Sequence, residues 1–263
     1  MLGSPGLCII DARFDLGDAE AGRAAWLEGH IPGAVHLDLN RDLSGQPGEH
    51  GGRHPLPGLE EMTDTFGRAG VGPDSRVVVY DEQTGMFAAR VWWMLRYLGF
   101  DTVQVLDGGF SAWQATGHPV SSEPTAPEPT VFVPDVRPEM LASRDEVMAA
   151  LGNEAVLIID ARSAERYRGE VAAFDPVAGH IPGAANYPHA DNVREGRLRP
   201  PAELAELYAE VGRAPETIAY CGSGVSAALD VLAIDEAGLA VPRLYAGSWS
   251  DWSSYRDAPV EKG

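Results

Sequence analysis

The chain has 263 residues, 44% of them hydrophobic, and a formal net charge of −19 at pH 7. This length fits one large domain or two medium ones. The acidic balance would repel phosphate backbones, and no apolar run approaches the ~18 residues of a membrane span, so we expect neither nucleic acid nor a membrane as a partner.

The only two cysteines, Cys8 and Cys221, are too few for a disulfide framework. They occupy unrelated places in the sequence, so reduced thiols are the simplest interpretation. The start of the chain lacks the basic stretch and long apolar core of a secretion signal. These features predict a cytoplasmic protein. We expect no metal site, because clustered Cys and His residues at zinc-binding spacing are absent from the sequence.

Short apolar strands alternate with helices in both halves of the chain. In chain order the first half predicts a strand over 7–11, a helix over 59–70, a strand over 76–80 and a helix over 86–99. The second half predicts a strand over 156–160, a helix over 201–212, a strand over 217–220 and a helix over 224–238. Such alternation predicts an α/β fold in which each sheet is mainly parallel and flanked by helices.

Four sequence blocks occur twice in the same order, which indicates a duplicated domain. The pairs are CIIDAR (8–13) with LIIDAR (157–162), GHIPGAV (29–35) with GHIPGAA (179–185), RVVVYD (76–81) with TIAYC (217–221), and VLDGGFSAW (105–113) with LYAGSWSDW (244–252). A proline-rich segment between the copies favours an extended linker. We therefore predict one domain over 1–120, a linker over 121–138 and a second domain over 139–263.

The stretch TIAYCGSGVSAALDVLAI, from Thr217 to Ile234, places Cys221 where a buried strand turns into a helix. The N–H groups of such a turn and of the first helical residues lack partners within the helix, so they form a concavity that binds anions. Glycines let the backbone approach the sulfur and serine hydroxyls can add donors; these residues are Gly222, Ser223, Gly224 and Ser226. This setting lowers a thiol pKa from about 8.5 and makes Cys221 the candidate nucleophile.

Four kinds of chemistry compete for this loop. The letters GSGVSA fit the G-x-G-x-x-A pattern of a dinucleotide site, but that motif should open a domain and precede an acidic ribose ligand, which the next strand lacks. A cysteine phosphatase usually closes such a loop with an arginine, whereas Ala227 stands there. A Cys–His protease has no local signature here. Sulfur transfer needs only a thiolate that becomes a persulfide, with no metal and no organic cofactor.

The tandem DAR…GHIPGA pattern, the CGSGVSA loop of the second copy and the closing GSWSDW resemble the two-domain rhodanese-type sulfurtransferases over essentially the whole chain. The resemblance implies two rhodanese-like domains, of which the first is catalytically silent, with Asp81 in the place of Cys221. It further implies transfer of a sulfane sulfur from 3-mercaptopyruvate, or alternatively from thiosulfate. The acceptor would be a thiol, a dithiol or cyanide.

The same resemblance implies which residues act. The neutral loop is similar to that of the 3-mercaptopyruvate type, in which Ser223 would relay a proton or donate a hydrogen bond to the sulfur of Cys221. Arg166 matches an arginine that the family uses on the substrate carboxylate. The other substrate-binding residues implied are Gly222, Gly224, Val225 and Ser226.

Some features depart from the family pattern or receive no role. The segment 169–180 has no second substrate arginine, and a family aspartate of the first domain has no clean match near Ala21. The repeated His30 and His180 are interpreted as residues that fix a turn. The loop GGRHPLP over 51–57 is expected to be rigid; a place beside the site across the domain interface is one interpretation of it, but nothing in the sequence assigns it a role. A non-catalytic interaction or regulatory module on a rhodanese fold remains the alternative of another class.

Overall fold

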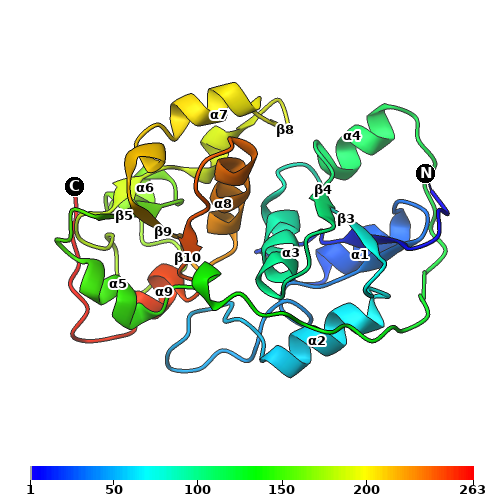
Figure 1. Ribbon diagram of the computed structural model, residues 1–263, viewed down its shortest axis with the longest axis horizontal. Helices are drawn as coiled ribbons and strands as arrows, with labels where there is room; N and C mark the ends of the chain where they lie inside the picture. The colour runs from blue at the N-terminus through cyan, green and yellow to red at the C-terminus, as the bar shows by residue number, and fades with distance from the viewer. Residues whose placement is uncertain (1) are drawn as a thin grey trace. The chain divides into compact units, whose positions relative to one another are not determined.

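The computed structural model describes residues 2–263, which divide into two compact units. The first unit runs to Gly45 and continues over Leu56–Arg137, and the second consists of Gln46–Pro55 and Pro138–Gly263 (Figure 1). The short segment Gln46–Pro55 therefore belongs to the second unit, although it lies within the first half of the sequence.

The first unit is built on a four-stranded sheet with the strand order β2-β1-β3-β4, and all its pairings are parallel. Its strands are β1 (Leu7–Asp11), β2 (Ala34–His36), β3 (Arg76–Tyr80) and β4 (Val103–Val105). Its helices are α1 (Ala21–Glu28), α2 (Leu59–Arg68), α3 (Met86–Tyr97) and α4 (Gly109–Ala115). The core is made by the apolar strand residues and by α3, which is buried over most of its length.

The second unit repeats this design with the strand order β10-β9-β5-β6, again with parallel pairings. The sheet strands are β5 (Val156–Asp160), β6 (Ala185–Asn186), β9 (Glu216–Tyr220) and β10 (Arg243–Leu244), and β7 (Val193–Arg194) and β8 (Arg197–Leu198) form a hairpin. The α-helices are α5 (Arg144–Ala150), α6 (Ala164–Tyr167), α7 (Pro201–Leu207), α8 (Ser226–Glu236) and α9 (Ser248–Trp252). Short 3₁₀ turns η1, η2 and η3 span Pro138–Met140, His189–Asn192 and Val211–Arg213.

Two α/β units with parallel sheets and flanking helices confirm the predicted fold class. The register of the duplicated strands is the same in both units: Asp11 pairs with Tyr80, and Asp160 pairs with Tyr220. The carboxyl ends of the two central strands therefore lie side by side, which places Cys221, the residue after Tyr220, at that edge of its sheet. Within residues 2–263, no helix combines the length and the apolar character that crossing a membrane requires.

The repeated DAR motif forms the same buried ion pair in each unit. Arg13 donates to Asp11 with a shortest N–O distance of 2.6 Å, and Arg162 donates to Asp160 at 2.5 Å. Each guanidinium also donates to the carbonyl of the first glycine of GHIPGA, at 2.7 and 2.8 Å respectively. Both pairs thus tie the end of the first strand to the turn before the second, which gives the motif an architectural role.

Backbone hydrogen bonds hold the proline-rich segment against the first unit. Thr130 N–H donates to the carbonyl of Gly67 at 2.9 Å, and Asp135 N–H donates to the carbonyl of Leu98 at 2.9 Å. The segment carries no regular helix or strand between α4 and η1, as its prolines predict. The domain limits 1–120 and 139–263 stay predictions.

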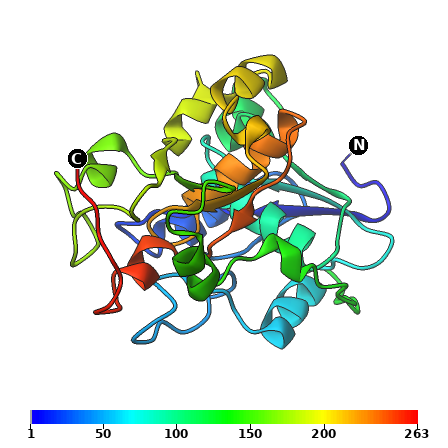
Figure 2. The same cartoon turned by 60° about the vertical axis from the view of Figure 1, so that its left-hand side comes forward.

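The segment Gln46–Pro55 is tied to the C-terminal elements of the second unit. Gly51 N–H donates to Asp251 Oδ1 at 2.7 Å, and Arg53 N–H donates to Ser250 Oγ at 3.1 Å. Figures 1 and 2 both show this light-blue loop running beside the red C-terminal part of the chain. Arg53 and His54, which follow Gly52, therefore lie next to the loop that follows β9 in the second unit.

Candidate functional site

The Cys221 loop, residues 221–226, joins β9 to α8. The Cys221 side chain is buried and accepts a hydrogen bond from Gly224 N–H at 3.2 Å. The hydroxyl of Ser226 and the N–H groups of residues 223 and 227 also interact with the sulfur. The loop therefore surrounds the sulfur with donors and with no acidic side chain of its own.

These donors change the ionisation of Cys221. Burial by itself raises the pKa of the thiol, but the Ser226 hydroxyl and the N–H groups of residues 227, 223 and 224 lower it by more, so the net shift of the pKa is downward. The predicted concavity is thus present, and it stabilises the thiolate form. Burial raises the pKa of the other thiol, Cys8, in spite of a hydrogen bond with Ser75.

The backbone around the loop requires glycine at position 224, and Gly222 leaves room for neighbouring side chains. Gly224 has a φ of +75°, and a Cβ there would lie 2.3 Å from the carbonyl oxygen of Ala246. A Cβ on Gly222 would lie 2.7 Å from a guanidinium nitrogen of Arg166 and 3.1 Å from one of Arg53. Because Gly222 has no side chain, the guanidinium groups of Arg166 and Arg53 can lie against the loop.

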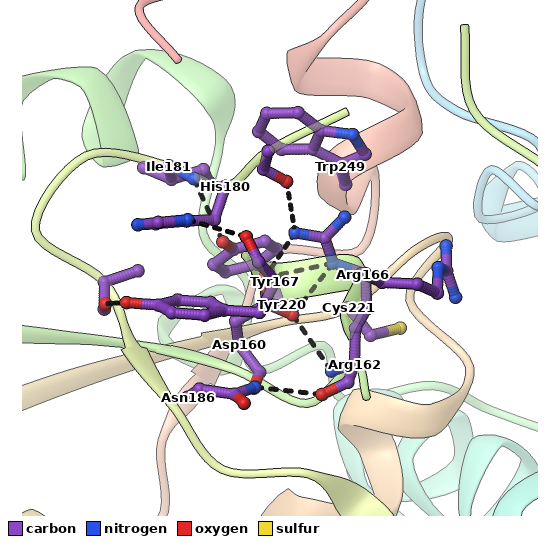
Figure 3. A network of polar contacts seen from close by, with 12 residues as sticks. Asp160, Arg162, Arg166, Tyr167, His180, Ile181, Asn186, Tyr220, Cys221 and Trp249 are labelled. Atoms are coloured by element: carbon purple, nitrogen blue, oxygen red, sulfur yellow. Dashed lines mark hydrogen bonds and ion pairs between the residues drawn. The ribbon is translucent and has the colours of Figure 1, made fainter. Parts of the chain in front are cut away.

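The closing GSWSDW motif supports the loop from behind. Ser248 Oγ accepts a hydrogen bond from Cys221 N–H at 3.0 Å and donates to the carbonyl of Tyr245 at 2.9 Å. Trp249 N–H donates to the carbonyl of Cys221 at 2.9 Å. Figure 3 shows the Cys221 side chain pointing away from the buried network around Asp160. The backbone of Cys221 is thus held on both sides while its sulfur faces the donors.

Ser223 has a partner that the sequence did not reveal. Its hydroxyl lies 2.8 Å from Nδ1 of His54, which the segment Gln46–Pro55 supplies. Ser223 itself is buried. A hydroxyl that is hydrogen-bonded to an imidazole can exchange a proton with it, because a ring nitrogen can either donate or accept. A proton route of two groups therefore begins beside Cys221.

Arg166, in α6, approaches the loop as one of a pair. Its Nη2 donates to Asp175 Oδ2 at 2.8 Å, and Arg53 forms an ion pair with Asp175 Oδ1. The Asp175 side chain is 0% exposed, whereas those of Arg53 and Arg166 are 31% and 20% exposed. One buried carboxylate thus holds two partly exposed guanidiniums beside Gly222.

The structure brings together all the site residues predicted from the sequence. Six of them, Cys221, Gly222, Ser223, Gly224, Val225 and Ser226, form the loop, and Arg166 reaches it from α6. The histidines of the repeated motif hold backbone carbonyls instead: His30 Nδ1 lies 2.6 Å from the Trp26 oxygen, and His180 Nδ1 lies 2.8 Å from the Tyr167 oxygen. These contacts agree with a turn-fixing role.

Sequence reasoning missed Arg53, His54 and Asp175. The first two follow the glycine pair Gly51-Gly52, whose φ angles are +94° and +85°. The adjacent glycines before Arg-His were the available signal in the sequence, because glycine adopts positive φ angles more readily than any other residue. Nothing local to the sequence marks Asp175.

The corresponding loop of the first unit holds a carboxylate where the second holds a thiol. Asp81 is buried, and its oxygens accept from the N–H groups of Gly85 at 2.9 Å and Phe87 at 3.0 Å. Both copies therefore keep a loop of inward-pointing N–H groups. In the first copy these groups bind the carboxylate of Asp81, a residue of the loop itself. Within residues 2–263, no three His, Cys, Asp or Glu side chains are grouped so that they could hold a metal ion.

Fold and site together define a duplicated α/β protein with one thiolate-stabilising loop between a central parallel strand and a helix. The family model for the rhodanese-like domain matches residues 1–116 and 143–255. The chain belongs to the rhodanese family, which confirms the resemblance found in the sequence.

The similar proteins are named as sulfurtransferases. A probable 3-mercaptopyruvate sulfurtransferase of Pseudomonas aeruginosa is 42% identical, with 100% of this chain and 94% of the relative aligned. The thiosulfate sulfurtransferase of Mus musculus is 36% identical over 98% of this chain and 88% of its own length. The crystal structure of the 3-mercaptopyruvate enzyme of Escherichia coli aligns with a TM-score of 0.84 and 35% identity, covering 94% of each chain.

Proposed function

We propose that this protein is a sulfurtransferase that moves the sulfur atom of 3-mercaptopyruvate to a thiol, dithiol or cyanide acceptor. The sulfur is carried as the sulfane sulfur of a persulfide on Cys221. The observation that carries the proposal is the buried sulfur of Cys221 inside a loop of hydrogen-bond donors, which lower the pKa of its thiol. The names of the full-length relatives support the same class of reaction. The reduced thiols further lead us to propose a cytoplasmic location.

In the first half-reaction the Cys221 thiolate attacks the sulfur of the donor. An S–S bond forms, the C–S bond breaks, and its electron pair goes to the methylene carbon of the donor, which leaves as the enolate of pyruvate. The proton of the donor thiol is transferred to that carbon, so the products are pyruvate and the Cys221 persulfide anion. In the second half-reaction the acceptor attacks the outer sulfur, the S–S bond breaks, and the Cys221 thiolate returns.

Each group of the site has a role in this scheme. The N–H groups of the loop stabilise the thiolate and then the persulfide anion, as donors aimed at a developing charge do. The guanidiniums of Arg166 and Arg53 hold the donor carboxylate, for which the planar arginine fork is suited. The Ser223–His54 pair carries the proton from the donor thiol to the departing carbon.

Thiosulfate is the second candidate donor, and relatives named thiosulfate sulfurtransferase favour it. Incubation with each donor, followed by intact-mass measurement, separates the possibilities. We expect a gain of one sulfur atom, mapped to Cys221, with 3-mercaptopyruvate. A gain only with thiosulfate would reverse the donor assignment, and no gain with either donor would leave the non-catalytic module as the better explanation.

The lowered pKa of Cys221 determines how persulfide formation depends on pH. An unshifted thiol of pKa about 8.5 becomes nearly tenfold more ionised between pH 6.5 and pH 7.5. Because the thiolate of Cys221 is favoured, its rate of persulfide formation should rise clearly less than this over the same interval. Thiosulfate is the donor for this rapid-quench measurement, since it has no proton to lose in the range. Alkylation of Cys8, whose pKa is raised, provides the steep reference curve.

Replacement of Ser223 by alanine should separate the two donors. Sulfur transfer from 3-mercaptopyruvate requires a proton to move, whereas transfer from thiosulfate does not. We expect kcat with 3-mercaptopyruvate to fall about 100-fold, the lower range for loss of general acid–base catalysis, while kcat with thiosulfate stays within about threefold. His54→Gln should act in the same direction, and the double variant should lose little more than either single one. An equal loss with both donors would contradict the proton role.

A further inference from the structure

We infer that Asp175 determines the donor selectivity of the site by cancelling one of its two positive charges. The inference rests on the proposed function, because it concerns the donor that the Cys221 loop accepts. Asp175 lies in the segment between α6 and β6, and no role follows for it from its sequence context.

Two guanidiniums lie beside Gly222. The guanidinium nitrogens of Arg166 and Arg53 approach within 2.7 and 3.1 Å of the point where a Cβ on Gly222 would stand. Each of these arginines pairs with a different oxygen of Asp175. The carboxylate is fully buried and the guanidiniums are partly exposed, so a donor can reach the two arginines but not Asp175 itself.

The charges of Arg53, Arg166 and Asp175 partly cancel. Two guanidiniums and one carboxylate give this cluster a net charge of +1 beside Gly222. The loop CGSGVSA adds only the Cys221 thiolate, which attacks either donor, so the cluster is the part of the site whose charge distinguishes the donors. The nearby His189 contributes little charge, because burial and then the adjacent Arg166 lower the pKa of its imidazole, and the carbonyl of Ala161 and Asp191 only partly oppose this. A net charge of +1 complements a monoanion such as 3-mercaptopyruvate. A dianion such as thiosulfate would keep one uncompensated charge.

Asp175 affects the choice between donors without contacting either of them. Asp175 is shielded from solvent and held by Arg53 and Arg166, so it acts on the donor through its charge and through the placement of those arginines. Charges near a low-dielectric site interact several times more strongly than they do in water. A like charge placed near the competing ligand is an established way to reject it. Asp175 is thus a positioning residue that discriminates against dianionic donors.

The test compares kcat/KM for 3-mercaptopyruvate and for thiosulfate in the full chain carrying Asp175→Asn. The substitution keeps the size of the side chain and raises the net charge of the site by one. We expect the ratio of the two kcat/KM values to shift toward thiosulfate by about tenfold, mainly through a lower KM for thiosulfate. The thiosulfate reaction should also become more sensitive to salt. Glu154→Gln, an equal charge change at an exposed residue, should leave the ratio unchanged.

A second variant keeps the inference testable if Asp175→Asn folds poorly. Arg53→Gln alone leaves Arg166 balanced by Asp175, so KM for 3-mercaptopyruvate should rise about tenfold with kcat within about twofold. The double variant Arg53→Gln/Asp175→Asn restores a net charge of +1 and should restore the preference for 3-mercaptopyruvate. Equal changes with both donors in Asp175→Asn, or a double variant no more selective than the singles, would overturn the inference. Absence of a Cys221 persulfide in the unaltered protein would instead overturn the proposed function.

Discussion

Replacing Cys221 by serine should abolish sulfur transfer and leave the fold intact. Serine is close to cysteine in size and fits the buried position, whose N–H is held by Ser248 Oγ at 3.0 Å. Its hydroxyl stays protonated near neutral pH and cannot carry a sulfur as a persulfide. We expect kcat/KM to fall by at least about 10³-fold with either donor, in line with the loss of other covalent nucleophiles.

The measurement pairs steady-state rates with the intact mass after exposure to donor. The variant should gain no sulfur atom, and its thermal midpoint should stay near that of the unaltered protein. Cys8→Ser is the matched control, because Cys8 lies in β1 with its Sγ 3.0 Å from the carbonyl of Gly70 and has no place in the reaction. Persulfide formation in Cys221→Ser, or loss of activity in Cys8→Ser, would show that Cys221 is not the nucleophile.

Replacing Arg162 by leucine should unfold the second unit far more easily. Arg162 lies over the Trp249 ring at 4.8 Å and is the ion-pair partner of Asp160, whose side chain is 0% exposed. Its loss leaves a buried carboxylate without a counter-charge and the carbonyl of Gly179 without this donor. Removing one partner of a buried ion pair costs about 3–5 kcal/mol, and we expect the free energy of unfolding to fall by that amount.

Urea unfolding followed by tryptophan fluorescence measures this loss. Arg13→Leu should destabilise the first unit in the same way, because Arg13 and Asp11 repeat the arrangement. Arg168→Leu serves as the control, since Arg168 pairs with Glu170 at the exposed surface and such pairs contribute little. If Arg162→Leu unfolds at the same urea concentration as Arg168→Leu, the DAR pair is not a structural element.

Most of the structural predictions rest on the duplication of sequence blocks. Strands such as LCIID and VLIID are short, apolar and end in a carboxylate, so local pattern alone marks them as buried parallel strands. The repeated order of blocks then predicts two similar sheets, as observed. Cys221 could be singled out because its donors are its own neighbours in sequence: the thiol, the turn and the helix start are consecutive residues.

The sequence by itself therefore determined the α/β fold, its duplication and the thiolate loop, because each depends on contacts within a strand, a turn or a helix. Only the tertiary structure decided the surroundings of that loop. His54 lies 169 residues from Ser223 in the sequence, and Arg53 lies 122 residues from Asp175. Such contacts depend on where Gln46–Pro55 packs, and that is decided by long-range hydrogen bonds rather than by local periodicity. The charge that we infer to select the donor thus depends on long-range packing around Asp175, whereas the attacking thiolate of Cys221 belongs to a local sequence motif.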